Sequence, residues 1–202
     1  MRTIFMLIAA VVLALLPAAV LCAAGPFITM ESGSESVSLT AEEIRDGKEA
    51  SIEAVMEAAT GASGPESVMF LLRRGSPNGT NLTAIYGNAG ENLLGTLPPA
   101  MRGFDEYGEL EEGYSLQVAV RDLNGDKKPD VLVATGDGAA VLTVAVFVYT
   151  PRGNERFRRI GVIEGQNSLH VDANGVISVP YGSQGLFMEY GVTSDGVLVQ
   201  KR

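Results

Sequence analysis

Short apolar runs separated by turn residues are the feature that most constrains how this chain folds. Beyond Tyr114 the runs are rich in β-branched residues. In residues 116–121, Leu, Val and Val alternate with Gln, Ala and Arg, which predicts a strand with one buried face. Residues 140–149 are apolar on both faces apart from Thr143, which predicts a central strand.

Turn signals recur between the apolar runs. Turns are expected at residues 76–81 and 150–154 and at the dipeptides Asn174-Gly175 and Asp195-Gly196, which suit tight hairpins. The strands expected around them are 68–72, 82–86, 131–135, 156–164, 168–173, 176–180, 185–192 and 197–200. Hairpins in series predict an antiparallel meander sheet.

One helix is expected near the start of this domain. Thr40 followed three residues later by Glu43 fits a capping box. Apolar residues then fall roughly on one side as far as Ala59, although Gly47 weakens the middle of the run. The expected fold class is therefore α+β and mainly β, with an N-terminal helix at about 41–59 and an antiparallel meander.

The N-terminus has the three parts of a secretory signal peptide. Arg2 supplies the basic start, residues 4–16 are all apolar, and small residues lead to Ala24. We expect cleavage after Ala24, a flexible linker over residues 25–39, and a single domain over residues 40–202. The alternatives are a retained membrane anchor and a lipid anchor at Cys22, where Leu21 makes the lipidation signal weak. Localisation is predicted to be periplasmic or secreted, with no membrane span after processing.

Composition excludes several classes of function. Asp and Glu number 24 against 15 Lys and Arg, giving a net charge of −9. Nucleic acid and anionic lipid both select basic patches, so neither is an expected partner. With one His and one Cys, the chain cannot form a zinc site from four thiolates or from paired thiolates and imidazoles.

Residues 122–130 contain the pattern closest to a binding site. Asp122, Asn124, Asp126 and Asp130 place side-chain oxygens at positions 1, 3, 5 and 9 of the segment, and Gly125 permits a tight curl. Ca²⁺ takes six to eight oxygen ligands, and the Lys128 carbonyl at position 7 is a further candidate. An Asp-rich hairpin without metal is the alternative. An EF-hand is disfavoured, because Lys127 and Val133 stand where that loop needs Gly and Glu.

This segment resembles the calcium loop of FG-GAP and VCBS repeats, Asp-x-Asp/Asn-Gly-Asp-Gly-x-Pro-Asp followed by a strand. The resemblance covers residues 114–135, and Lys127 replaces the second Gly of the pattern. It implies a Ca²⁺ site in a hairpin between two strands, as in the β-propeller blades of adhesion and ligand-binding proteins. A complete propeller repeats the motif, whereas this sequence has one copy; Asp172-Ala-Asn174-Gly175 shares only the first positions.

No nucleophile and base pair is visible in the sequence. His170 is expected to face outward between the core residues Leu169 and Val171, and its neighbours two positions away cannot form a catalytic triad with it. We therefore expect a non-catalytic binding or structural module of the cell envelope, with an unidentified protein or glycan ligand. The alternative is an extracytoplasmic hydrolase with paired carboxylates between the acidic segment 105–112 and the sheet.

Overall fold

A computed structural model describes residues 27–31, 35–56, 66–74, 80–86, 90–96, 101–149 and 157–201. The predicted signal peptide, Cys22 and the cleavage point after Ala24 lie outside these residues, as do the predicted turn at 150–154 and most of the turn at 76–81. Within the described part, no helix is long and apolar enough to cross a membrane.

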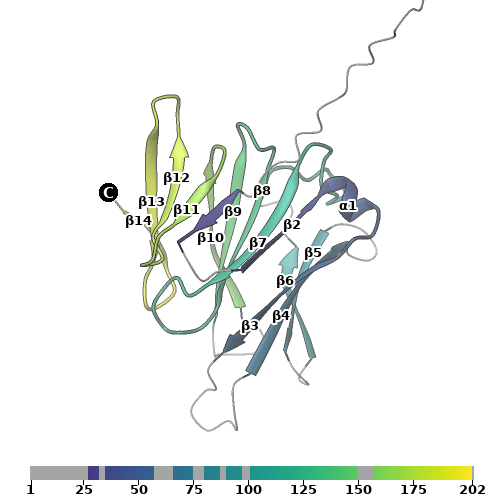
Figure 1. Ribbon diagram of the computed structural model, residues 1–202, viewed down its shortest axis with the longest axis horizontal. Coiled ribbons are helices and arrows are strands. Elements are labelled where there is room, and N and C mark those ends of the chain that lie inside the picture. Colours follow the sequence, from purple (N-terminus) through teal and green to yellow (C-terminus); the bar gives the residue numbers. More distant parts are fainter. Residues whose placement is uncertain are drawn as a thin grey trace, which may run out of the picture.

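A five-stranded antiparallel sheet forms the centre of the fold (Figure 1). Its order is β10-β9-β8-β7-β2, from β2 (Glu35–Thr40), β7 (Ser115–Arg121), β8 (Asp130–Gly136), β9 (Leu142–Tyr149) and β10 (Phe157–Gly165). The prediction of an interior strand over 140–149 is confirmed, since β9 pairs with β8 on one side and β10 on the other.

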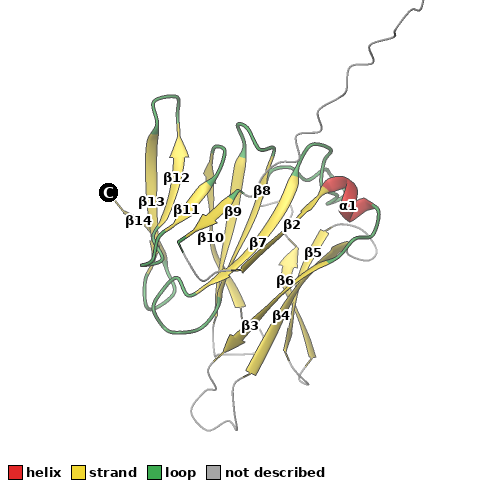
Figure 2. Ribbon diagram, viewed as in Figure 1, coloured by secondary structure: helices red, strands yellow, loops and turns green. Residues whose placement is uncertain are grey.

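Two further sheets complete the described structure. The C-terminal sheet has the order β1-β11-β12-β13-β14, from β1 (Ile28–Met30), β11 (Leu169–Val171), β12 (Ile177–Tyr181), β13 (Leu186–Val192) and β14 (Leu198–Lys201). The third is a meander of β3 (Ala50–Met56), β4 (Glu66–Arg74), β5 (Thr80–Tyr86) and β6 (Gly90–Thr96). Except for the parallel pair β1–β11, these neighbours are antiparallel, so the predicted mainly-β class with antiparallel pairing is confirmed (Figure 2). The single predicted meander is instead divided among three sheets.

Apolar side chains cover both faces of the central sheet. On one face Leu116, Val118 and Val133 pack with the helix, with Phe70 of β4 and with the 101–110 segment. On the other face the core is closed by β1 and the C-terminal sheet; its members include Phe27, Ala119, Leu132, Val144, Leu169 and Val179. The aromatic rings of Phe70 and Phe157 meet edge to face, with centroids 5.2 Å apart. The central strands are thus buried from two sides.

This burial corrects the expectation of one solvent face on the 116–121 strand. Gln117 is 1 % exposed and belongs to the buried polar residues. Its side-chain oxygen accepts the Ile28 N–H at 2.8 Å, and its amide donates to the Ile28 carbonyl at 3.4 Å. The polar residue in the pattern therefore serves the backbone of β1 instead of facing water, and a single strand's alternation cannot distinguish these two roles.

The predicted helix is shorter than expected. The Thr40–Glu43 capping box is present, and α1 (Ala41–Arg45) follows it. Gly47 then takes a φ of +82°, and the N–H groups of Asp46 to Lys48 bond back to carbonyls of the helix. This left-handed residue ends the helix. The rest of the range predicted to be helical includes β3, because those residues pair with β4 along their whole length.

The range 25–39 is not a flexible linker where the structure describes it. It contains β1 and most of β2, which pair with β11 and β7. Phe27, Ile28 and Leu39 are buried. The linker prediction rested on the polar residues between these apolar ones. β1 and β2 instead join two sheets, and their backbone partners come from strands far along the chain.

Candidate metal loop

Residues 122–130 connect β7 to β8, two adjacent antiparallel strands. Arg121 and Asp130 are directly paired in that ladder, so both ends of the loop are fixed by the central sheet. The expected placement of the loop between two strands is confirmed.

Asp122 organises the first half of the loop. Its Oδ1 accepts the N–H groups of Gly125 at 2.7 Å and Asn124 at 3.2 Å, and its Oδ2 accepts the Lys127 N–H at 2.9 Å. One carboxylate therefore serves three backbone donors within five residues. The chain must curl around it, which explains why a short acidic side chain stands at this position.

Two further side chains repeat this arrangement. The Asn124 Oδ1 accepts the Asp126 N–H at 3.0 Å, and the Asp126 Oδ1 accepts the Lys128 N–H at 2.8 Å. Each is a turn in which a side-chain oxygen bonds the backbone two residues on. Each of these oxygens keeps a second lone pair, so the contacts within the loop do not exhaust its capacity to accept.

The backbone is strained at one point of the loop. Lys127 has a φ of +63°, in the left-handed region, and Gly125 has a φ of +78°. A side chain with a Cβ raises the cost of this conformation by about 1–2 kcal/mol. A Gly at this position would adopt the same φ without that cost, because it has no Cβ.

Asp130 lies beneath the loop and is completely buried. Its Oδ2 accepts the Leu123 N–H at 2.9 Å, and its Oδ1 accepts the Tyr149 N–H at 3.1 Å, which ties the loop to itself and to β9. Burial raises the pKa of Asp130 to about 7. The two hydrogen bonds lower this pKa, while the negative charges of Asp126 and Asp122 raise it further.

The five predicted ligands thus occur on one loop but differ in exposure. Asp126 is exposed, Asp122, Asn124 and Lys128 are half-buried, and Asp130 is buried. Among the described residues, no three His, Cys, Asp or Glu side chains gather closely enough to form a metal cluster on their own. The predicted set includes an amide and a main-chain carbonyl, and its oxygen chemistry suits Ca²⁺.

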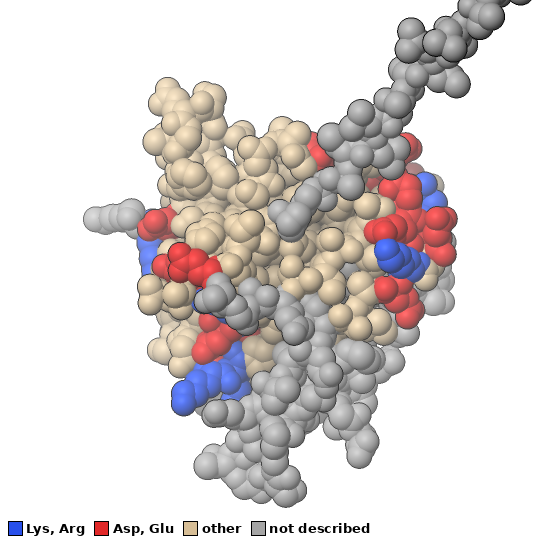
Figure 3. All heavy atoms as spheres, in the orientation of Figure 1, with Lys and Arg blue, Asp and Glu red and all other residues tan. Residues whose placement is uncertain are grey.

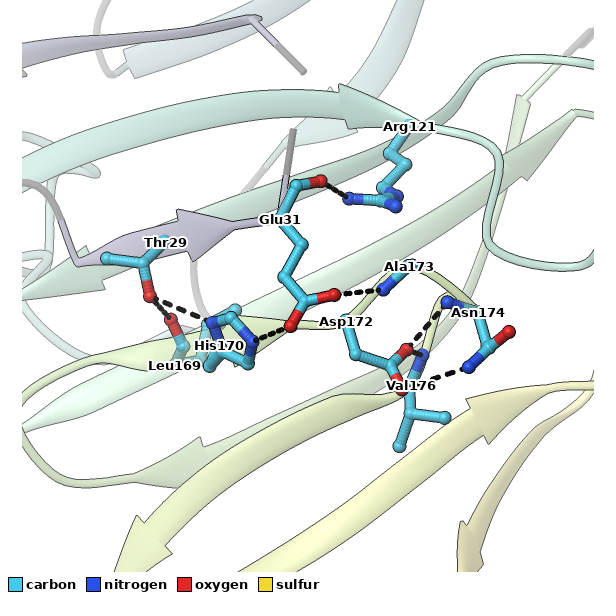
Figure 4. Close-up of polar contacts among 9 residues, drawn as sticks. All are labelled: Thr29, Glu31, Arg121, Leu169, His170, Asp172, Ala173, Asn174 and Val176. Atoms are coloured by element: carbon cyan, nitrogen blue, oxygen red, sulfur yellow. Dashed lines mark hydrogen bonds and ion pairs between the residues drawn. The ribbon is translucent and has the colours of Figure 1, made fainter. Parts of the chain in front are cut away.

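A second group of polar contacts lies beside the loop (Figure 4). The Arg121 side chain donates to the Glu31 carbonyl at 2.7 Å, and the Glu31 carboxylate accepts the Ala173 N–H at 3.1 Å. Ala173 belongs to the β11–β12 turn, in which the Asp172 carboxylate accepts the N–H groups of Asn174 and Val176. These contacts connect β1, β7 and β11, and nothing local in the sequence indicated Glu31.

His170 is exposed, as the alternation of β11 predicted. Its Nδ1 lies 3.4 Å from the Thr29 Oγ1, and its Nε2 lies 3.7 Å from the Glu31 Oε1 (Figure 4). Thr29 lies on the neighbouring parallel strand β1, and Glu31 directly follows that strand. Sequence reasoning missed these partners because they are about 140 residues away along the chain.

The segment 101–113, which includes the acidic residues 105–112, is partly embedded. Met101 and Leu110 belong to the core, while Glu111 and Glu112 are exposed. The Asp105 Oδ1 accepts the N–H groups of residues 107 and 109, so this carboxylate shapes a turn.

No protein-family model matches this chain, and neither a curated protein nor a solved structure matches it.

Proposed function

We propose that residues 122–130 bind one Ca²⁺ and that the protein is an exported, non-catalytic binding or structural module of the cell envelope. The observation that carries the calcium proposal is the curl in which Asp122, Asn124 and Asp126 each bond backbone N–H groups of the same loop. That curl holds oxygen donors at alternate positions of one short turn.

Charge supports the same assignment. Asp122 and Asp126 raise the pKa of the buried Asp130, which means that their negative charges act on a third carboxyl group. A bound divalent cation would supply positive charge that offsets this repulsion. The chain's own contribution is to fix the loop ends through the β7–β8 ladder and to orient the side chains through backbone N–H groups.

The role that follows is mainly structural. The loop joins two strands buried on both faces, and it contacts the turn after β11. Pinning the loop would stabilise the junction between the central and C-terminal sheets. Lys127 and the small ligand set suggest modest affinity, on the order of the 10⁻⁴–10⁻³ M of extracellular modules. Millimolar calcium would then stabilise the fold by about 0.4–1.4 kcal/mol.

Calorimetric titration and thermal melts in chelated buffer test the metal site. Calcium at about 5 mM should raise the thermal unfolding midpoint of the wild-type protein but not that of Asp126→Ala. Magnesium should substitute poorly for calcium. Asp105→Ala is the matched control, because Asp105 shapes an acidic turn outside the loop. It should keep the full calcium response. Equal shifts in wild type and Asp126→Ala, or none in either, would show an acidic turn without a metal site.

The binding role and the export need separate tests. Pull-down from an envelope extract with and without chelator should recover a protein or glycan ligand that depends on calcium. Mass spectrometry of protein from the native host should find a chain beginning near residue 25. A diacylated Cys22 would show that the protein is held by a lipid anchor instead of being cleaved near residue 25. An intact Met1 on cytoplasmic protein would contradict export.

The hydrolase alternative finds little support in the site. A glycosidase needs a carboxylic acid of raised pKa within reach of its substrate. Among the described carboxyl groups, Asp130 is the one whose pKa is clearly raised, and it is fully buried under the loop. Asp105, from the acidic segment, is occupied by backbone N–H groups.

A further inference from the structure

Three large apolar side chains are exposed at the tip of the β12–β13 hairpin. Phe187 is 61 % exposed, Leu186 47 % and Tyr181 38 %. They flank the turn 182–185, in which Gly182 and Gly185 both have positive φ and open space around them. Every residue from 181 to 187 is exposed, so the described fold does not cover this tip.

The tip is apolar on both faces of the hairpin. Tyr181 and Leu186 are direct partners in the ladder, so they share the face that Val179 buries against the core. Phe187 is the next residue along β13 and therefore points to the opposite face, where it pairs with Pro180. A flat protein partner could cover one of these faces, whereas a surrounding medium covers both.

The outer part of the hairpin also lacks charge. Residues 173–188 contain no Asp, Glu, Lys, Arg or His, in a chain of net charge −9. The hairpin that projects at the upper left in Figure 1 is tan in Figure 3, which has the same orientation and shows acidic side chains in red and basic ones in blue. Immersing this tip in an apolar medium requires no desolvation of an ionised group, which would be the largest cost.

The tip is smaller than the surface that a stable protein dimer uses. Specific protein interfaces use roughly 20–30 residues on each side. The exposed tip has seven residues, of which three are large and apolar. Shallow insertion into a lipid surface needs only a few apolar side chains, and Tyr and Phe are suited to the boundary between headgroups and acyl chains.

We propose that the β12–β13 hairpin inserts its tip into the interface of an electrically neutral lipid bilayer. Tyr181, Leu186 and Phe187 are the inserted side chains, and the turn 182–185 lies among the headgroups. Because the tip has no positive charge and the chain as a whole is acidic, binding requires no anionic lipid and does not weaken with salt. The protein would then sit on a membrane surface independently of its calcium loop.

The chain contains no Trp, so a single Phe187→Trp substitution makes a local fluorescent probe. Phosphatidylcholine vesicles should shift its emission to shorter wavelength, and brominated acyl chains should quench it, equally at low and high salt. A local probe is needed because residues 4–16 are apolar and could carry the full-length chain to vesicles by themselves. Tyr107→Trp is the matched control, since Tyr107 is 66 % exposed beside acidic residues and should not respond.

Adding Leu186→Ser to the Phe187→Trp chain should lower the vesicle partition coefficient about tenfold, because a Leu side chain loses its apolar surroundings. Val199→Ser, at an exposed position on β14, should leave it unchanged. The proposal is overturned if the probe's spectrum does not change with vesicles. It is also overturned if the shift appears without lipid and grows with protein concentration, which would identify a second copy as the partner.

Discussion

Gly175, in the turn between β11 and β12, lies directly against the main chain of Leu123 in the candidate metal loop. A Cβ at Gly175 would stand 2.6 Å from the Leu123 carbonyl oxygen, and the φ of Gly175 is +75°. This contact brings together two loops that are some fifty residues apart in sequence. Backbone lies against backbone here, so no side-chain movement could accommodate a larger residue.

Gly175→Ala should therefore lower the free energy of unfolding by about 2–4 kcal/mol, through both the left-handed φ and the clash with a buried backbone. Gly182→Ala is the matched control, because Gly182 has a φ of +66° but open space around it. It should cost only about 1–2 kcal/mol. Urea unfolding of both variants measures the difference, and equal losses would contradict the close packing of the two loops.

Lys127→Gly should stabilise the loop and strengthen calcium binding. The substitution removes the cost of a Cβ at a φ of +63°, and the greater freedom of Gly in the unfolded chain offsets part of the gain. The expected net gain in unfolding free energy is about 0.5–1 kcal/mol, measured by urea unfolding in chelated buffer.

Asn167 provides the comparison, since it also has a positive φ, of 58°. Asn tolerates this conformation better than Lys, so Asn167→Gly should gain less and should leave calcium affinity unchanged. If Lys127→Gly lowers the free energy of unfolding, the contacts of the Lys side chain stabilise the fold by more than its positive φ destabilises it.

In calcium-free buffer, Asp130 should make the fold less stable as the pH rises. Its pKa is about 7 in the folded protein, above the ordinary value of 3.8. Between these values the folded state holds a proton that the unfolded state has lost, so stability falls as pH increases. The stabilising contribution is complete below pH 3.8 and is lost as the pH passes through about 7.

Urea unfolding from pH 5 to 7 measures this slope, which approaches about 1.4 kcal/mol per pH unit for one proton. Asp130→Asn should remove the slope, and it should also lower stability throughout because one carboxamide oxygen replaces two acceptors. Calcium should flatten the slope in wild type, since a cation favours the ionised carboxylate. An identical slope in wild type and variant would assign the pH dependence to other groups.

The paired threonines of β8 and β9 should respond oppositely to the same substitution. Thr135 and Thr143 are cross-strand partners and both are fully buried. The Thr135 hydroxyl donates to the Arg102 carbonyl at 2.8 Å, whereas the Thr143 hydroxyl has no hydrogen-bond partner among the described residues.

Thr143→Val should raise the free energy of unfolding by about 0.5–1 kcal/mol, because it replaces an unsatisfied hydroxyl with a methyl group. Thr135→Val should lower it by about 1–2 kcal/mol, because it leaves the Arg102 carbonyl without that donor. Thermal melts of the two variants provide the measurement. A loss of stability in Thr143→Val would reveal a partner for that hydroxyl, such as a bound water.

Local patterns accounted for much of the C-terminal half. The expected hairpins at Asn174-Gly175 and Asp195-Gly196 are present, because Gly there takes the positive φ that tight turns require. The strands around them are β11 to β14. The placement of the candidate metal loop between two strands was equally visible, since the Asp and Asn residues that curl the loop act on neighbours within five positions.

The incorrect predictions of a long helix and of a linker have a common cause. Residues 50–56 have an apolar pattern that suited a helix, and the pairing with β4 decided that they form a strand. Residues 27–31 were predicted to be a linker, but β11 supplies backbone partners for them, and the core between the central and C-terminal sheets buries Phe27 and Ile28. Sheet pairing joins segments far apart in sequence, so the partner that satisfies a strand's backbone is absent from its own pattern.

The sequence by itself determined the turns at Asn174-Gly175 and Asp195-Gly196, the strand-rich class, the helix cap at Thr40 and the loop of alternating oxygens, because each depends on residues within a few positions of one another. Tertiary structure alone decided that Gln117 points inward to Ile28, that Asp130 is buried with a raised pKa, and that Glu31 lies beside His170. Those features depend on which surfaces meet, and burial and long-range contact arise only when the sheets pack.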